Sequence, residues 1–224
     1  MGAIKWLKYR VNDLRESGRA VRGRIERYFI RNDDFCIISN NCWGGWVYRY
    51  YGLPYSSPTV GNFIISEDYV RFVRNLKYYL SLELQIIDPE DAHRAEDLKT
   101  YVELYGRYPV GRLADVDIHF LHDTDAATAK EKWERRTERV NFNKILVKYS
   151  TQNLWTMEDC RAFSDWDFPN KIIFAPGPME GIQDVVVFKK DEGLPETRNE
   201  GEEYWRYINM TSYIRNMKET GNYF

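Results

Sequence analysis

Apolar residues occur along this chain in two patterns, short continuous runs and longer stretches with helical spacing. The continuous runs are typical of strands buried on both faces. They predict strands at residues 34–39, 84–87, 115–122, 145–149, 171–175 and 184–188, with a short strand or extended segment at 63–65. Helical spacing predicts helices at 43–51, 66–80, 126–140 and 202–217, and a short one after residue 156. This alternation predicts an α/β fold, a three-layer sandwich around a mainly parallel, Rossmann-like sheet.

Polar residues mark the ends of several predicted helices. Gly52-Leu-Pro54 is expected to end the helix at 43–51, because glycine readily adopts the left-handed conformation that closes a helix. Ser66 is an expected N-cap, and the segment Asp123-Thr-Asp125 is expected to cap the next helix. Thr156 begins a sequence that resembles a capping box, so it is also an expected N-cap. These signals favour the same element boundaries as the apolar pattern.

The first 32 residues predict a basic helical arm ahead of a single α/β domain at 33–224. Its apolar residues recur at helical spacing before and after Gly18, namely Ile4, Leu7, Val11, Leu14, Val21, Ile25, Tyr28 and Phe29. Residues 1–31 hold nine lysines and arginines against three acidic residues. We expect this helix to pack on its own domain or on a second subunit in a homo-oligomer. The alternative is peripheral contact with the anionic inner face of a membrane.

Composition narrows the class of protein. The 224 residues carry a formal net charge of −2, so no global positive field favours nucleic acid. The three cysteines form no CxxC pair, which indicates a reducing compartment. No apolar run approaches the roughly 20 residues of a membrane span, and the first residues do not resemble a signal peptide. The expected location is therefore the cytoplasm.

Cys42 is the first candidate for chemistry. It follows the predicted strand at 34–39 and precedes a helix, in the segment Ser39-Asn-Asn-Cys-Trp-Gly-Gly45. Ligands and reactive groups collect at such turns in open α/β sheets, and the start of a helix can lower a thiol pKa. Cys42 is therefore a candidate nucleophile, although most cysteines are simply buried apolar residues. Cys36 and Cys160 are interpreted as packing residues.

His122 is the expected proton acceptor. It ends the predicted strand at 115–122 and could lie at the same sheet edge as Cys42, with Asp123 or Asp125 orienting its imidazole. Predicted substrate contacts come from the turn after the first strand, from a hydroxyl-rich loop, from the second strand histidine and from a helix end. They are Ser39, Asn40, Asn41, Gly44, Gly45, Ser57, Thr59, His119 and Arg136. The asparagines and the two glycine amides are expected to stabilise an oxyanion, although asparagines at such turns more often cap them.

Asp115-Val-Asp117 is a second candidate motif. Two carboxylates at this spacing resemble the metal- and nucleotide-binding motif of many glycosyltransferases. The pair precedes its apolar run instead of ending it, and no metal ligand set is evident, so no metal site is predicted. His93 is given no role.

Five separated motifs resemble a known family. They are Ser39-Asn-Asn-Cys-Trp-Gly-Gly45, Ser57-Pro-Thr-Val-Gly61, Tyr108-Pro-Val-Gly111, His119-Phe-Leu-His122 and Lys132-Trp-Glu-Arg-Arg136. Together they resemble DUF1919, a bacterial domain family of unknown function whose members are often labelled exopolysaccharide biosynthesis proteins, over about residues 33–217. The Asn-Cys turn is also similar to capsule-associated acetyltransferase-like proteins and, more distantly, to SGNH-type esterases. The Gly-Asp-Ser and carboxyl-terminal Asp-x-x-His motifs of SGNH enzymes are absent.

These observations and resemblances lead to an expected function. The first hypothesis is an O-acyl- or acetyltransferase that acts on a cell-surface polysaccharide or its precursor, with an acyl donor such as acetyl-CoA and no other cofactor implied. The second is a nucleotide-sugar-dependent glycosyltransferase that uses Asp115 and Asp117. The third is a noncatalytic glycan-binding or assembly protein that uses the aromatic residues, which make up 16% of the chain.

Overall fold

A parallel sheet forms the centre of the molecule. The computed structural model describes residues 18–224, so the part of the predicted arm before residue 18 lies outside the described residues. Sheet A has the strand order β1-β5-β6-β7, and every neighbouring pair is parallel. Its strands are β1 (Cys36–Ser39), β5 (Ile145–Ser150), β6 (Lys171–Ala175) and β7 (Val185–Val187). The predicted mainly parallel α/β architecture is confirmed.

A second, antiparallel sheet was not predicted. Sheet B has the order β2-β3-β4, formed by β2 (Gln85–Ile87), β3 (Val110–Leu113) and β4 (Val116–His119). The expectation that the strand before His122 joins the parallel sheet is therefore wrong. A short turn at residues 114–115, where Ala114 has a φ of 52°, folds β4 directly back on β3. A connection this short allows only antiparallel pairing.

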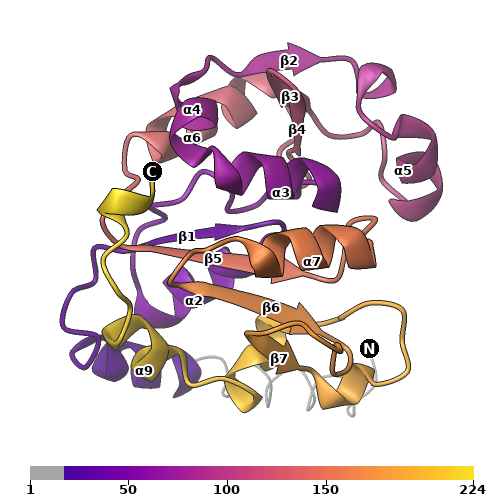
Figure 1. Ribbon diagram of the computed structural model, residues 1–224. Coiled ribbons are helices and arrows are strands. Elements are labelled where there is room, and N and C mark those ends of the chain that lie inside the picture. Colours follow the sequence, from indigo (N-terminus) through magenta and orange to yellow (C-terminus); the bar gives the residue numbers. More distant parts are fainter. Residues whose placement is uncertain (1–17) are drawn as a thin grey trace, which may run out of the picture.

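Helices cover both faces of sheet A, as Figure 1 shows. The helices α3 and α7 lie on one face, and sheet B lies beyond α3; α2 and α9 lie on the other face. The α-helices are α2 (Trp43–Tyr51), α3 (Ser66–Arg74), α4 (Leu76–Ser81), α5 (Ala95–Tyr101), α6 (Ala126–Thr137), α7 (Met157–Asp165), α8 (Glu200–Glu203) and α9 (Met210–Arg215). Short 3-10 helices occur at Pro89–Asp91, Lys189–Asp191, Tyr204–Arg206 and Gly221–Tyr223.

Alternate residues of the central strands enter two different cores. Ile38, Val147 and Ile173 pack against α3 and α7, whereas Ile37 and Leu146 pack against α2 and the carboxyl-terminal helices. This two-sided burial is the physical reason for the continuous apolar runs, because neither face of the sheet contacts water.

A backbone seam joins the two sheets. The Ile64 amide donates to the carbonyl of Asn40, which directly follows β1 (3.1 Å). Phe63 and His119 exchange two backbone hydrogen bonds of 3.0 and 2.9 Å, which link the same segment to β4. The predicted extended segment at 63–65 thus brings the carboxyl ends of β1 and β4 together.

Several predicted helix boundaries hold, and others are corrected. The helix expected at 66–80 is divided at Asn75 into α3 and α4. The helix at Trp43–Tyr51 ends at Gly52 in the left-handed conformation, and Asp125 and Thr156 are N-caps, as expected. Ser66 is not an N-cap: it is the first residue of α3, and its hydroxyl donates to the Gln152 carbonyl (3.1 Å). The expected helix at 202–217 is broken into α8, a 3-10 turn and α9.

Residues 18–27, within the range of the predicted arm, form a helix. Within residues 18–224, the helices are all too short or too polar to cross a bilayer.

Candidate functional site

A cleft lies where the seam joins the two sheets, and both polar and apolar side chains line it. Its volume is about 430 Å³, within the range of small-molecule sites. Loops after β1, β5, α5 and β4 surround it, together with segments near residues 61–63 and 196. It is lined by Asn41, Cys42, Gly61, Asn62, Phe63, Tyr101, Val102, Glu103, Leu104, Leu121, His122, Gln152, Asn153 and Glu196.

Cys42 and His122 both line the cleft, and each lies in the segment that follows a strand of a different sheet. Cys42 occupies the N-cap position of α2 and is half-buried, whereas His122 is exposed on the opposite side of the seam. Gly61, with a φ of 87°, lies beside His122: a Cβ atom there would lie 4.0 Å from the imidazole Cδ2. Cys42, His122 and Asn41 are therefore the predicted site residues that line this cleft.

The expected lowering of the Cys42 pKa is not found. Burial raises the pKa of the thiol, and the nearby Lys148 ammonium offsets this effect only in part. Although Cys42 occupies the N-cap of α2, its side chain makes no capping hydrogen bond to an amide of the first helical turn. At neutral pH Cys42 is a protonated thiol, which is a poor nucleophile.

Asn40 and Asn41 hold the walls of the cleft. The Asn40 side chain exchanges hydrogen bonds with the backbone of Ser150, donating at 3.0 Å and accepting at 2.9 Å. Asn41 donates to Gln152 Oε1 and Glu200 Oε2, both at 2.8 Å, and accepts from the Trp43 amide. Because these amide groups already have partners, they fix the two strand ends relative to each other.

The other predicted substrate contacts lie outside the cleft lining. The Ser39 hydroxyl donates to Asn41, and the buried Ser57 and Thr59 hydroxyls bond to each other behind β1. Gly44 and Gly45 allow α2 to approach Ile37 and Val60 closely, since added Cβ atoms would lie 3.3 and 3.1 Å from those side chains.

The charged residues predicted for the site also contact groups outside the cleft lining. Arg136 donates to the Val60 carbonyl (2.6 Å) and lies over the Tyr55 ring. Asp123 forms an ion pair with Lys132, and Asp125 caps α6 by accepting from the Thr128 amide. These contacts engage both of the carboxylates expected to orient His122.

Beneath the cleft, Lys148 and Glu200 form a fully buried ion pair. The Lys148 ammonium also donates to Asn41 Oδ1 (3.2 Å) and lies 4.8 Å from the centre of the Phe174 ring. The second Glu200 oxygen accepts from the hydroxyls of Ser150 and Thr197. Burial lowers the pKa of Lys148, whereas Glu200 acts in the opposite direction.

His119 is buried in an aromatic cluster behind the cleft. Its ring stacks on Phe63 with centroids 4.4 Å apart and planes 7° apart, and Tyr108 lies edge-on at 6.0 Å. Among the described residues, none hydrogen-bonds to either ring nitrogen. Burial lowers the pKa of His119 to about 4, so the ring is neutral near pH 7.

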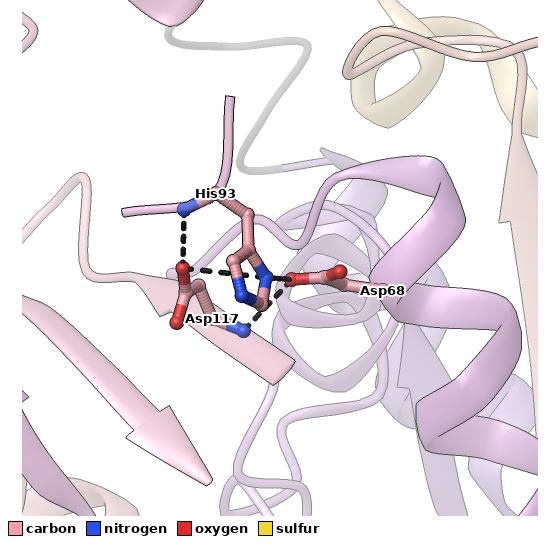
Figure 2. Close-up of side chains that lie close together, drawn as sticks. All are labelled: Asp68, His93 and Asp117. Carbon is pink, nitrogen blue, oxygen red and sulfur yellow. Dashed lines mark hydrogen bonds and ion pairs between the residues drawn. The ribbon is translucent and has the colours of Figure 1, made fainter. Parts of the chain in front are cut away.

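A third cluster, Asp68, His93 and Asp117, joins α3 to sheet B (Figure 2). His93 Nδ1 lies 2.9 Å from Asp68 Oδ2, and the His93 amide donates to Asp117 (2.6 Å). Imidazole and carboxylates are suitable metal ligands. Here, however, Arg71 pairs with Asp68, and Arg112 binds Asp117 through two hydrogen bonds of 2.7 and 2.8 Å. These cations already neutralise both carboxylates, so we interpret the cluster as a structural clasp.

The two carboxylates of the Asp-Val-Asp motif have different environments. Asp117 is fully buried in the clasp, whereas Asp115 is exposed and accepts a hydrogen bond from the Tyr79 hydroxyl (2.8 Å). This arrangement leaves no shared position for a metal ion between them. A larger hollow of about 590 Å³ between β6, β7 and α9 contains neither imidazole nor thiol.

Sequence reasoning missed Tyr101, Glu103, Gln152, Asn153 and Glu196 in the cleft. Gln152 and Asn153 follow β5, so the rule applied to the first strand could have found them. Asn153 and Leu154 both have left-handed backbone conformations, with φ of 60° and 59°. The Asn153 amide donates to the Tyr101 hydroxyl (2.9 Å), which accepts it and in turn donates to Glu196 (2.8 Å).

Comparisons with known proteins identify relatives of this chain. The model of a family described as "Domain of unknown function (DUF1919)" matches residues 15–218. An uncharacterized protein of Haemophilus influenzae is 28% identical over 187 residues, which cover 80% of this chain and 83% of that protein.

Proposed function

The chain belongs to the DUF1919 family, whose function is unknown, and from the chemistry of the cleft we propose that it is a transferase acting on a sugar. The more specific proposal is acyl transfer to a hydroxyl group of a cell-surface polysaccharide or its precursor. The observation that carries it is the exposed His122 imidazole on the wall of a cleft that also holds two carboxylates.

The lining suits a polyhydroxylated ligand. Glu103 and Glu196 offer acceptors for sugar hydroxyls, and the carboxylate of Glu196 is already oriented by Tyr101. Val102, Leu104 and Leu121 provide an apolar strip for the C–H face of a sugar ring. A few polar groups beside apolar contacts are typical of sites that orient a small ligand.

His122 would act as the general base. Its imidazole accepts the proton of a sugar hydroxyl while the hydroxyl oxygen attacks the acyl carbon of a thioester such as acetyl-CoA. The new C–O bond forms, the C–S bond breaks, and the proton passes from His122 to the departing thiolate. The acyl group moves directly to the sugar in this scheme, because the protonated Cys42 thiol is a poor nucleophile.

The test uses the purified full chain with acetyl-CoA and a panel of bacterial sugars, and detects acetylated product by mass spectrometry. We expect His122→Gln to lower the rate by about 10²-fold or more, the usual contribution of general base catalysis. The matched control, His93→Gln, exchanges the same residue type outside the cleft and should keep the rate. Equal rates for His122→Gln and the unmodified chain would contradict the role of His122.

Cys42→Ala separates direct transfer from a covalent route. Direct transfer predicts that this variant keeps most of its activity and that no acetylated protein accumulates. A loss of all activity together with an acetyl-cysteine adduct on the unmodified chain would support the nucleophilic role of Cys42. The proposed function would be contradicted if none of the sugars gave a product and NMR detected no sugar contact at the cleft.

A further inference from the structure

The helix at residues 18–27 turns one narrow face toward the domain. A Cβ atom added to Gly23 would lie 1.9 Å from the Tyr50 carbonyl oxygen, so the helix backbone lies directly against α2. On the same face, Glu26 accepts a hydrogen bond from the Thr211 hydroxyl (2.5 Å), and Ile30 is completely buried after the helix ends. These contacts fix which side of the helix faces outward.

The outward side carries an apolar row, Val21, Ile25, Tyr28 and Phe29. These side chains are 57%, 56%, 86% and 57% exposed, and their spacing places them along one side of a helix and its final turn. A helix on a globular domain normally turns such a row inward. Here the row faces away from the domain, which is typical of an interaction surface.

Positive charge surrounds this row. Arg22 and Arg24 are both exposed beside it, and Arg22 also pairs with Glu26 on the same helix (2.7 Å). Residues 1–31 contain nine lysines and arginines and three acidic residues, whereas residues 32–224 contain 23 basic and 31 acidic residues. The charge that complements this surface is therefore negative.

The sequence helps to decide whether a second copy of the chain or an anionic surface covers this apolar row. Leu7, Leu14, Val21 and Tyr28 recur every seven residues, as in a coiled coil with a second copy. However, the positions that flank such a seam are mainly basic, namely Lys8, Arg10, Arg15, Arg22 and Arg24. Two copies would therefore place like charges opposite each other, which disfavours pairing.

We propose that the outward row of helix 18–27 docks on the surface of an anionic phospholipid bilayer. The apolar side chains enter the headgroup region, the arginines contact lipid phosphates, and the Tyr28 and Phe29 rings suit the interface. This inference is independent of the proposed transferase reaction.

The test is co-sedimentation of the full chain with vesicles of phosphatidylcholine alone or mixed with phosphatidylglycerol. We expect binding to the anionic vesicles and a loss of binding at high salt. The double variant Val21→Glu/Ile25→Glu should bind at least about tenfold more weakly. The control, Tyr78→Glu/Met157→Glu, changes the charge equally at two exposed apolar positions on α4 and α7 and should bind normally.

Three results would overturn the proposal. The first is equal binding to both kinds of vesicle, and the second is unchanged binding of Val21→Glu/Ile25→Glu. The third is absence of vesicle binding, combined with a dimer in light scattering that this variant converts to a monomer, which would assign the row to a second copy. Circular dichroism and thermal unfolding establish that each variant remains folded.

Discussion

Two buried polar groups behind the same cleft have opposite surroundings. Lys148 in sheet A is fully buried and has Glu200 and Asn41 as partners, whereas His119 in sheet B is equally buried and, within residues 18–224, has no hydrogen-bond partner for either ring nitrogen. Lysine keeps its charge when buried only if it is paired, whereas histidine can lose its proton and be buried as a neutral ring. Lys148 therefore contributes to stability through its ion pair with Glu200, whereas His119 contributes through the packing of its neutral ring.

The largest expected effect comes from separating the buried pair. Lys148→Met leaves the Glu200 carboxylate without its cation and should lower the free energy of unfolding by about 3 to 5 kcal/mol. Urea unfolding measures this change. Lys148→Met/Glu200→Leu removes both charges and should recover most of the loss. Lys190→Met, which breaks the more exposed Lys190–Glu203 pair, serves as the control and should change stability by about 1 kcal/mol or less.

His119 should make the free energy of unfolding depend on pH. In the unfolded chain a histidine gains a proton near pH 6.5, whereas folded His119 remains neutral down to about pH 4. The unfolded state therefore binds more protons between these values, and His119 should lower stability by about 3 kcal/mol as pH falls from 6.5 to 4.

His119→Phe keeps the stacking on Phe63 and removes the titration. The stability difference between this variant and the unmodified chain should grow as the pH falls, measured by urea unfolding at several pH values. A constant difference between His119→Phe and the unmodified chain would contradict the assignment.

The clasp provides an intermediate case. Burial alone would raise the pKa of Asp117, yet hydrogen bonds from Arg112 and the His93 amide outweigh burial and lower it. Asp117→Asn should lower the free energy of unfolding by about 2 kcal/mol at neutral pH, because water still reaches part of Arg112.

The pH dependence of this effect has a defined sign. Because the folded pKa of Asp117 is lowered, its contribution is present at neutral pH and is lost as pH falls below the ordinary value of about 3.8. The stability gap between Asp117→Asn and the unmodified chain should therefore narrow in acid. Asp115→Asn changes the exposed partner in the motif and should alter stability by about 0.5 kcal/mol or less.

The smallest effect concerns Cys42, which is only half-buried beside the charged pair. Its raised pKa predicts slow alkylation by iodoacetamide, with a half-point above the roughly 8.5 of a free thiol. A Cys36→Ala/Cys160→Ala background isolates the rate of Cys42. A half-point well below that of a free thiol would instead favour the nucleophilic role.

The apolar pattern predicts the central sheet well because burial on both faces gives its strands an unmistakable composition. The helix at 43–51 and its end at Gly52 follow from local rules that need no tertiary information. Sheet B was missed as a separate sheet because β4 is also buried, so its apolar run resembles that of a parallel strand. The break after Glu203 depends on how the carboxyl-terminal segment packs on α2.

The sequence predicts only part of the cleft lining, because some of its residues are placed by long-range contacts. Asn41 and Cys42 follow one predicted strand and His122 ends another, and the sequence rule about strand ends places all three in the cleft. Glu196 lies in a loop and Tyr101 ends α5, and their meeting in the cleft depends on long-range contacts such as the hydrogen bond between them. His93 appears isolated among charges in the sequence, and only folding brings it to Asp68 and Asp117.

The backbone seam between the two sheets also has a dynamic consequence. Its three hydrogen bonds involve the amides of Phe63, Ile64 and His119, which lie directly behind the cleft. A ligand that contacts both walls would hold the sheets together and suppress local opening of this seam. Hydrogen exchange at these three amides would then slow on ligand binding. Their exchange rates can therefore detect a ligand in the cleft before the reaction is identified.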